Sequence, residues 1–85
     1  EQGGVKPGDS VVVVGCGPVG LLAVMAAQHL GASQVWAVDG VPERLAMAAS
    51  LGATALDFRS QDVPAVVKAG TDGRGADVAL EVSIV

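Results

Sequence analysis

The stretch SVVVVGCGPVGLLAVMAAQHLGASQVWAVD, Ser10 to Asp39, decides how this chain folds. It begins with four β-branched residues, Val11 to Val14, which are typical of a strand that is covered on both faces in a parallel sheet. A glycine-rich turn follows, and the apolar segment Val19 to Leu30 then predicts a helix that ends at a glycine. A second apolar run, Val35 to Val38, predicts another strand and leads directly into an acid. The stretch therefore predicts a βαβ unit.

The turn of this unit reads GCGPVG and contains Gly15, Gly17 and Gly20. The first glycine permits the tight turn, the second lets the backbone approach a pyrophosphate, and the third lets the helix pack closely on the strand. Pro18 has no N–H and a fixed φ, so it suits the first turn of the helix. The unpaired N–H groups there, chiefly those of Val19 and Gly20, and the positive end of the helix dipole predict a diphosphate site. The preceding strand and the following helix are the context that this motif requires.

Asp39 lies 19 residues after Gly20, close to the spacing of about 20 residues expected for an acid that binds ribose hydroxyls. A carboxylate there accepts hydrogen bonds from both hydroxyls and repels a 2′-phosphate, so we expect NAD rather than NADP. Arg44 is near enough in the sequence to reach the same ribose or the adenine. It also permits two other readings, accommodation of a 2′-phosphate or a simple ion pair with Asp39 or Glu43.

The composition narrows the function classes. The 85 residues suit one small domain or part of one, and with 51% apolar but only 2% aromatic residues the core must consist of Val, Ala and Leu. A net charge of −4 without a basic stripe argues against nucleic acid. One cysteine and one histidine offer no zinc site, so we expect no metal ligand in this chain. A single cysteine cannot form an internal disulfide, so we expect a cytoplasmic location. The uncharged run 11–27 is interrupted by GCGP and is shorter than the about 20 residues of a membrane-spanning helix, so we expect no membrane span.

The rest of the chain continues the alternation, with a predicted helix at 42–51, a strand at 53–58, a helix at 63–69 and a strand at 76–82. The order βαβαβαβ with right-handed crossovers predicts an α/β fold, a partial Rossmann-type doubly wound parallel sheet with strand order 3-2-1-4. Residues 1–9 are predicted to be a connector from an upstream catalytic domain, because the lead-in is loose and residue 1 is not methionine. Residues 10–85 are then the N-terminal part of a dinucleotide-binding domain.

Several single residues leave alternatives open. The helix at 19–30 is apolar nearly all round, so we expect it to be sandwiched between other elements. His29 is predicted to be a solvated residue of the last helical turn rather than a catalytic one, and Trp36 to pack in the core rather than to stack on a base. Cys16 reads as a small filler, although a helix N-terminus can lower a thiol pKa. Glu81 either lines the ligand crevice or is a solvated strand end.

Four segments, VKPGDSVVVVGCGPVG, VDGVPERL, LGAT and GADVALEV, resemble in order and spacing the coenzyme domain of the medium-chain, zinc-dependent alcohol and polyol dehydrogenases. The resemblance covers nearly the whole chain. It implies an oxidoreductase that transfers hydride between an alcohol or polyol and NAD. It also implies that the pyrophosphate is held by Gly15, Gly17, Pro18, Val19 and Gly20, and the adenosine ribose by Asp39 and Arg44.

The same resemblance places the catalytic zinc and the substrate pocket mainly upstream of residue 1, and the nicotinamide contacts after residue 85. It therefore implies zinc for the parent enzyme, but no catalytic residue and no activity for this chain alone. A homo-dimer or tetramer is also implied. The sequence departs from the family after Glu81, where a glycine turn is usual and VSIV stands instead, which leaves the path of residues 83–85 open.

Two other functions remain as alternatives. A zinc-free, NADPH-dependent reductase of the same superfamily is disfavoured by Asp39. A regulatory domain that senses a nucleotide without chemistry would use the same turn and acid, but it would not explain the VKPGD lead-in.

Overall fold

The computed structural model describes residues 4–82, so residues 1–3 of the predicted connector and the path of Ser83 to Val85 lie outside the described residues. Within residues 4–82, strands and helices alternate without exception, as predicted. The elements are β1 (Ser10–Val14), α1 (Pro18–His29), β2 (Gln34–Asp39), α2 (Pro42–Ser50), β3 (Thr54–Asp57), α3 (Val63–Ala69) and β4 (Val78–Glu81).

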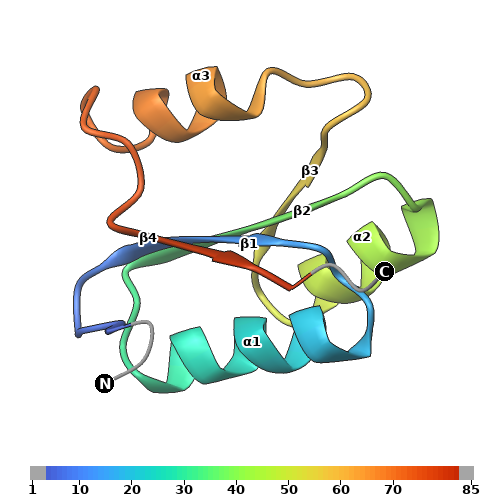
Figure 1. The fold of residues 1–85 in the computed structure, drawn as a ribbon, viewed down its shortest axis with the longest axis horizontal. Coiled ribbons are helices and arrows are strands. Elements are labelled where there is room, and N and C mark those ends of the chain that lie inside the picture. The colour runs from blue at the N-terminus through green and yellow to red at the C-terminus, as the bar shows by residue number, and fades with distance from the viewer. Residues whose placement is uncertain (1–3, 83–85) are drawn as a thin grey trace.

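The strands form one parallel sheet in the order β3-β2-β1-β4, which confirms the predicted fold class and strand order. Figure 1 shows α1 and α2 together on one face of the sheet and α3 on the opposite face. This arrangement follows from right-handed crossovers, because the chain crosses one face on its way from β1 to β3 and the other face on its way to β4. All strands point the same way, so their carboxyl ends share one edge of the sheet.

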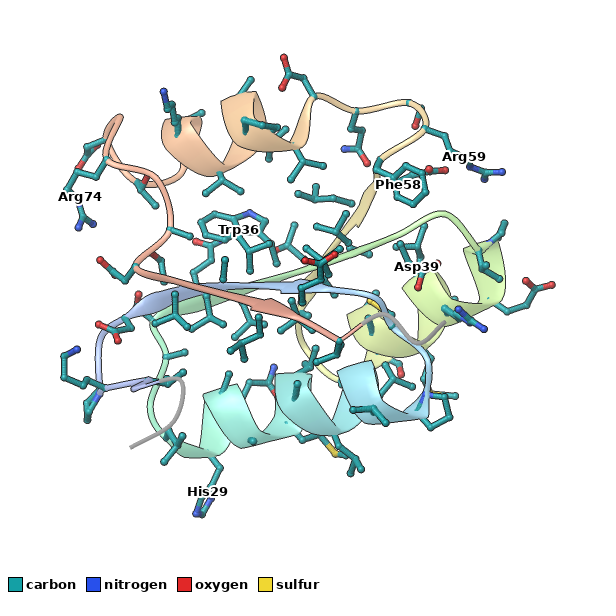
Figure 2. The ribbon with its side chains drawn as sticks, viewed as in Figure 1. His29, Trp36, Asp39, Phe58, Arg59 and Arg74 are labelled. Carbon is teal, nitrogen blue, oxygen red and sulfur yellow. The ribbon has the colours of Figure 1, made fainter. Side chains whose placement is uncertain are left out.

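Two apolar clusters cover the two faces of the sheet. On the side of α1 and α2, alternate residues of the central strands pack with small side chains of both helices; the buried set includes Val11, Val13, Val24, Ala27, Val35, Ala37 and Ala48. On the side of α3, the intervening residues pack with Val67; this set is Val12, Trp36, Val38 and Leu56. Figure 2 shows Trp36 between the sheet and α3, which agrees with the predicted packing role.

The element bounds differ from the predicted ones by one or two residues. Helix α1 spans 18–29 rather than 19–30, and β3 and β4 are shorter than the predicted 53–58 and 76–82. Pairing nevertheless continues beyond β4, because the N–H groups of Asp77 and Val82 donate to carbonyl oxygens of β1 at 2.9 and 3.0 Å. Before β1 the chain makes a turn at Pro7 and Gly8, with Gly8 at a φ of 88°.

The prediction that α1 is sandwiched is wrong. Its inner face is buried through Gly20, Val24 and Ala27, but on its outer face Leu22 has 61% of its surface exposed and Met25 42%. An all-apolar helix shows no preferred face in the sequence, so the periodicity could not reveal which side lacks a neighbour. His29 lies in the last turn of α1 and is exposed, as predicted, and points away from the sheet (Figure 2). In residues 4–82, no helix has the length and apolarity needed to cross a membrane.

Candidate functional site: the carboxyl edge of the sheet

The glycine turn joins β1 to α1 at the carboxyl edge of the sheet. Gly15 has a φ of 97°, in the left-handed region that favours glycine, and its N–H donates to the carbonyl oxygen of Val38 at 2.8 Å. A Cβ on Gly20 would overlap the carbonyl oxygen of Gly15, so only glycine allows α1 to start this close to the turn. A Cβ on Gly17 would meet only the guanidinium of Arg44, at 3.9 Å. The backbone at Gly17 is therefore accessible to a ligand.

The first turn of α1 presents N–H groups without helical acceptors. The helix begins at Pro18, and the N–H of Leu21 donates to the carbonyl oxygen of Gly17 at 2.9 Å. The N–H groups of Val19 and Gly20 precede this hydrogen bond, so they belong to the donors that a helix leaves unpaired. No acidic residue occupies this turn. The positive end of the helix dipole is thus open to an anion.

Asp39 ends β2 directly beside this turn, and backbone donors hold its carboxylate in place. Oδ2 accepts from the N–H of Cys16 at 2.7 Å, and Oδ1 accepts from the N–H groups of Gly40 and Val41 at 2.6 and 3.0 Å. Only 9% of the side chain is exposed. Burial by itself raises the pKa of Asp39, but the three N–H donors and the nearby Arg44 outweigh this effect and leave the pKa below its usual value. The carboxylate is therefore ionised at neutral pH.

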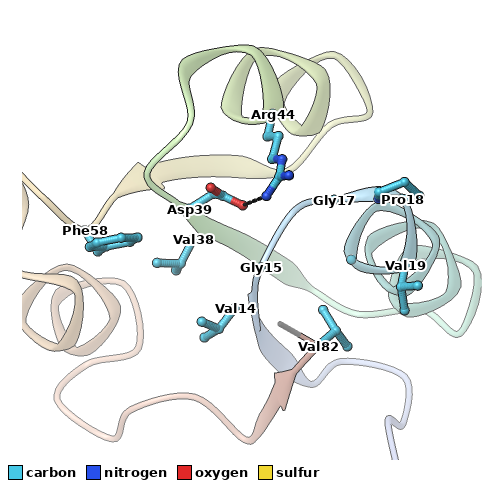
Figure 3. Close-up of a pocket in the computed structure, with 11 residues that line it drawn as sticks. Val14, Gly15, Gly17, Pro18, Val19, Val38, Asp39, Arg44, Phe58 and Val82 are labelled. Atoms are coloured by element: carbon cyan, nitrogen blue, oxygen red, sulfur yellow. Dashed lines mark ion pairs between the residues drawn. The ribbon is translucent and has the colours of Figure 1, made fainter. Parts of the chain in front are cut away.

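Arg44 reaches Asp39 from the first part of α2. Its Nη1 lies 3.7 Å from Oδ2 of Asp39, and its side chain is 52% exposed. Of the two partners considered from the sequence, the structure pairs it with Asp39, as Figure 3 shows. The guanidinium lies between the glycine turn and the acid and is half-exposed to water.

A cavity of about 420 Å³ joins these groups. Its volume is in the range of ligand pockets. All seven site residues predicted from the sequence line it: Gly15, Gly17, Pro18, Val19, Gly20, Asp39 and Arg44. In Figure 3 the side chain of Asp39 faces the glycine turn, with the Arg44 guanidinium between the acid and Gly17.

Four apolar residues of the cavity were not predicted from the sequence: Val14, Val38, Phe58 and Val82. Each lies at the carboxyl end of a strand: Val14 ends β1, Val38 is the next-to-last residue of β2, and Phe58 and Val82 directly follow β3 and β4. In a parallel sheet these positions share the carboxyl edge, where open α/β sheets bind their ligands. The signal that identifies them is thus their position at the strand ends, not their chemistry.

Two candidates from the sequence take no part in the cavity. Glu81 is an exposed residue at the end of β4 and does not line it, whereas its neighbour Val82 does. Cys16 is fully buried, and its thiol contacts the carbonyl oxygen of Val38 at 3.6 Å. Burial raises the pKa of the Cys16 thiol and the charge of Asp39 raises it further, so the role of a small filler is favoured over reactivity.

The residues that the structure describes do not fit a metal ion. Between residues 4 and 82, no three His, Cys, Asp or Glu side chains come together as a ligand cluster. The residues at the carboxyl edge instead fit a dinucleotide, since they combine unpaired backbone donors, an ionised acid and apolar walls.

Comparison with known proteins gives matches over most of the chain. A family model described as zinc-binding dehydrogenase matches residues 18–85. An L-threonine 3-dehydrogenase of Bacillus subtilis is 44% identical over 77 residues, which are 89% of this chain and 22% of that protein.

Solved structures agree with these matches. The alcohol dehydrogenase TADH from Thermus sp. ATN1 superposes with a TM-score of 0.92 at 48% identity, over 95% of this chain and 23% of that one. The 2R,3R-butanediol dehydrogenase of Bacillus subtilis superposes with a TM-score of 0.89 at 42% identity, over 96% and 24%. The chain spans about a quarter of the length of the curated relatives that it matches.

Proposed function

The chain belongs to the zinc-binding dehydrogenase family, and on that premise we propose that it forms the NAD-binding portion of an alcohol or polyol dehydrogenase. The observation that carries the proposal is the cavity that connects the unpaired N–H groups of α1 with the ionised carboxylate of Asp39. A dinucleotide offers the matching pair of groups, because its adenosine ribose carries the diphosphate at one end and the diol at the other.

In this proposal the N–H groups of Val19 and Gly20 donate to the diphosphate, and the open backbone at Gly17 lets it approach. The carboxylate of Asp39 accepts from the adenosine ribose. A carboxylate has about four acceptor positions, and backbone N–H groups already use three of them. The ribose therefore takes the remaining position on Oδ2, where it competes with Arg44. The movement of Arg44 toward the second hydroxyl would relieve that competition.

Asp39 also supports the choice of NAD over NADP. Its charge is nearly excluded from water and is held in place by the backbone, so a 2′-phosphate beside it would be repelled at short range. Arg44 is half-exposed, so water screens its attraction for that phosphate more strongly.

The proposal assigns a division of labour to the whole protein. Bound NAD supplies the hydride chemistry, and this chain binds and orients its adenosine half. Zinc would be held by other parts of the protein, because the described residues show no ligand cluster. The alcohol or polyol substrate would be held there too. Residues 1–9 would connect this domain to the one that holds them.

The test is a titration of the protein with NAD and NADP, before and after Asp39→Ala. We expect NAD to bind better than NADP to the wild-type protein. In the variant we expect NAD affinity to fall about tenfold, because a charged hydrogen-bond acceptor is lost, and NADP to become the better ligand. Asp77→Ala removes a comparable acid at the other edge of the sheet and should change neither affinity.

The result also separates the alternatives. Preference of the wild-type protein for NADP would overturn the NAD assignment in favour of the reductase. Tight NAD binding by a full-length protein that oxidises no alcohol or polyol would favour the nucleotide-sensing domain.

A further inference from the structure

A second acid and a second arginine stand beside the ribose acid. The strand register pairs Asp39 of β2 with Asp57 of β3, so the two carboxylates end neighbouring strands at the same edge. The backbone extends this pairing, since the N–H of Phe58 donates to the carbonyl oxygen of Asp39 at 3.3 Å. The segment that follows β3 is thus fixed next to the proposed ribose site.

Arg59 is held by Asp57 through three hydrogen bonds. Its Nε and Nη2 each lie 3.2 Å from a different carboxylate oxygen of Asp57, and its backbone N–H donates to Oδ1 at 2.9 Å. The bidentate arrangement is the strongest one available to an arginine and a carboxylate. The side-chain hydrogen bonds from Arg59 accordingly lower the pKa of Asp57. Both partners are therefore charged at neutral pH.

The stem of Arg59 passes over the residue that follows the ribose acid. A Cβ on Gly40 would lie 2.9 Å from Cζ of Phe58 and 3.5 Å from Cδ of Arg59. The N–H of Gly40 donates to Oδ1 of Asp39, whereas Arg44 faces Oδ2, so the Arg59 stem runs beside the backbone at the Oδ1 end of this carboxylate. Figure 2 shows the Arg59 guanidinium directed outward, away from Asp39.

We propose that Asp57 helps the protein to discriminate against NADP by holding Arg59 away from the adenosine ribose. This inference rests on the proposed function of the cavity. An arginine is the side chain best suited to bind a phosphate in a bidentate way. Arg44 and Arg59 together would flank a 2′-phosphate from two sides, and the pairing of Arg59 with Asp57 removes one of them. Selectivity then depends on two acids, one that repels the phosphate and one that occupies a potential phosphate ligand.

The expected effect is modest, because the pair is exposed to solvent. Arg59 has 58% of its side chain exposed, and exposed ion pairs are weak. Release of Arg59 should therefore raise affinity for a 2′-phosphate by about fivefold while Asp39 is present. It should add to the larger gain caused by removal of Asp39.

The experiment measures the affinity of the full-length protein for 2′,5′-ADP and 5′-ADP by calorimetry, with Asp57→Asn as the central variant. Asparagine keeps an oxygen that accepts from the N–H of Arg59 but removes the charge that holds the guanidinium. We expect about fivefold tighter binding of 2′,5′-ADP and no change for 5′-ADP. The matched control is Asp72→Asn, which removes the same charge from an exposed turn where the φ of 55° suits asparagine.

A second pair of variants tests the guanidinium once it is released. In an Asp57→Asn background, Arg59→Ala should weaken 2′,5′-ADP binding about fivefold, whereas Arg74→Ala, another exposed arginine paired with an aspartate, should not. If 5′-ADP binds and neither Asp57→Asn nor Arg59→Ala alters the preference for 2′,5′-ADP, the inference is overturned and the proposed function stands. If no variant binds either nucleotide, the proposed function fails and the inference with it.

Discussion

The two edges of the sheet carry similar aspartates in different surroundings. At the carboxyl edge Asp39 accepts from three backbone N–H groups and faces Arg44 at 3.7 Å. At the amino edge Asp77 accepts from the N–H and the hydroxyl of Ser10 and faces Arg74 at 3.6 Å. Yet the Asp39 side chain is 9% exposed beside a cavity, and the Asp77 side chain is 36% exposed.

The difference shows what makes an acid part of a binding site. Strands β1, β2 and β3 each lead into the N-terminus of a helix at the carboxyl edge, and each of the three helices returns the chain to the amino edge. Unpaired N–H groups and positive dipole ends therefore gather at one edge only. Asp77 ties two neighbouring strands together, whereas Asp39 does the same and also faces an anion site.

The largest expected effect comes from the turn that creates this difference. Gly20→Ala places a methyl group on the carbonyl oxygen of Gly15, so α1 must move away from the turn. We expect a loss of about 3 kcal/mol in the free energy of unfolding and no measurable NAD binding. Urea unfolding followed by circular dichroism measures the first effect, and calorimetry the second.

Gly17→Ala is the matched control in the same turn, because its methyl group would meet only Arg44 atoms at 3.9 Å or more. It should unfold like the wild-type protein but bind NAD about tenfold more weakly, since the methyl group stands where the diphosphate approaches. Equal stability losses in the two variants would contradict the steric argument.

An intermediate effect is expected when two single variants, Asp39→Asn and Asp77→Asn, are compared. In the first variant an amide must face three buried backbone donors that a carboxylate satisfied, and we expect a loss of about 2 kcal/mol in the free energy of unfolding. The second variant should lose less, because water replaces the lost interactions at Asp77. Urea midpoints of the two proteins measure the difference. A larger loss for Asp77→Asn would show that burial does not distinguish the two edges.

The smallest effect is expected from pH. The pKa values of Asp39 and Asp77 are both lowered in the folded state, Asp39 by backbone donors that outweigh burial and Asp77 by the hydrogen bonds from Ser10. Groups with a lowered folded-state pKa stabilise the protein above the unfolded pKa of about 3.9, and this stabilisation is lost as the pH falls through the folded value. When urea midpoints are measured from pH 7 to pH 3, we expect the midpoint to decrease once the pH is below about 4.

Asp39→Asn provides the check, because it removes one of these titrating groups and should flatten the acid limb of the stability curve. An acid limb identical to that of the wild-type protein would mean that Asp39 is not held by its neighbours as the structure shows.

Most of the fold and of the candidate cavity could be predicted from local patterns in the sequence. The four valines of β1, the glycine turn, the proline at the start of α1 and the acid after β2 are local signals, each readable within one stretch of chain. Together with the alternation of the later strands and helices, the nearby Arg44 and the family resemblance, they predicted the strand order and the seven residues that the structure brings to one cavity. The number of residues between the glycine turn and the acid predicts that the two lie close together, because strand, turn and helix have fixed dimensions.

The sequence could not show which residues meet across the sheet or which helix faces remain exposed. The exposed outer face of α1, the contribution of Phe58 and Val82 to the cavity, and the pairing of Asp57 with Asp39 all depend on contacts between segments far apart in the chain. A local pattern carries no information about such contacts, because parallel strands acquire their neighbours only when the crossovers close. The glycine turn and the acid could therefore be predicted from the sequence, whereas the apolar residues that line the cavity around them could not.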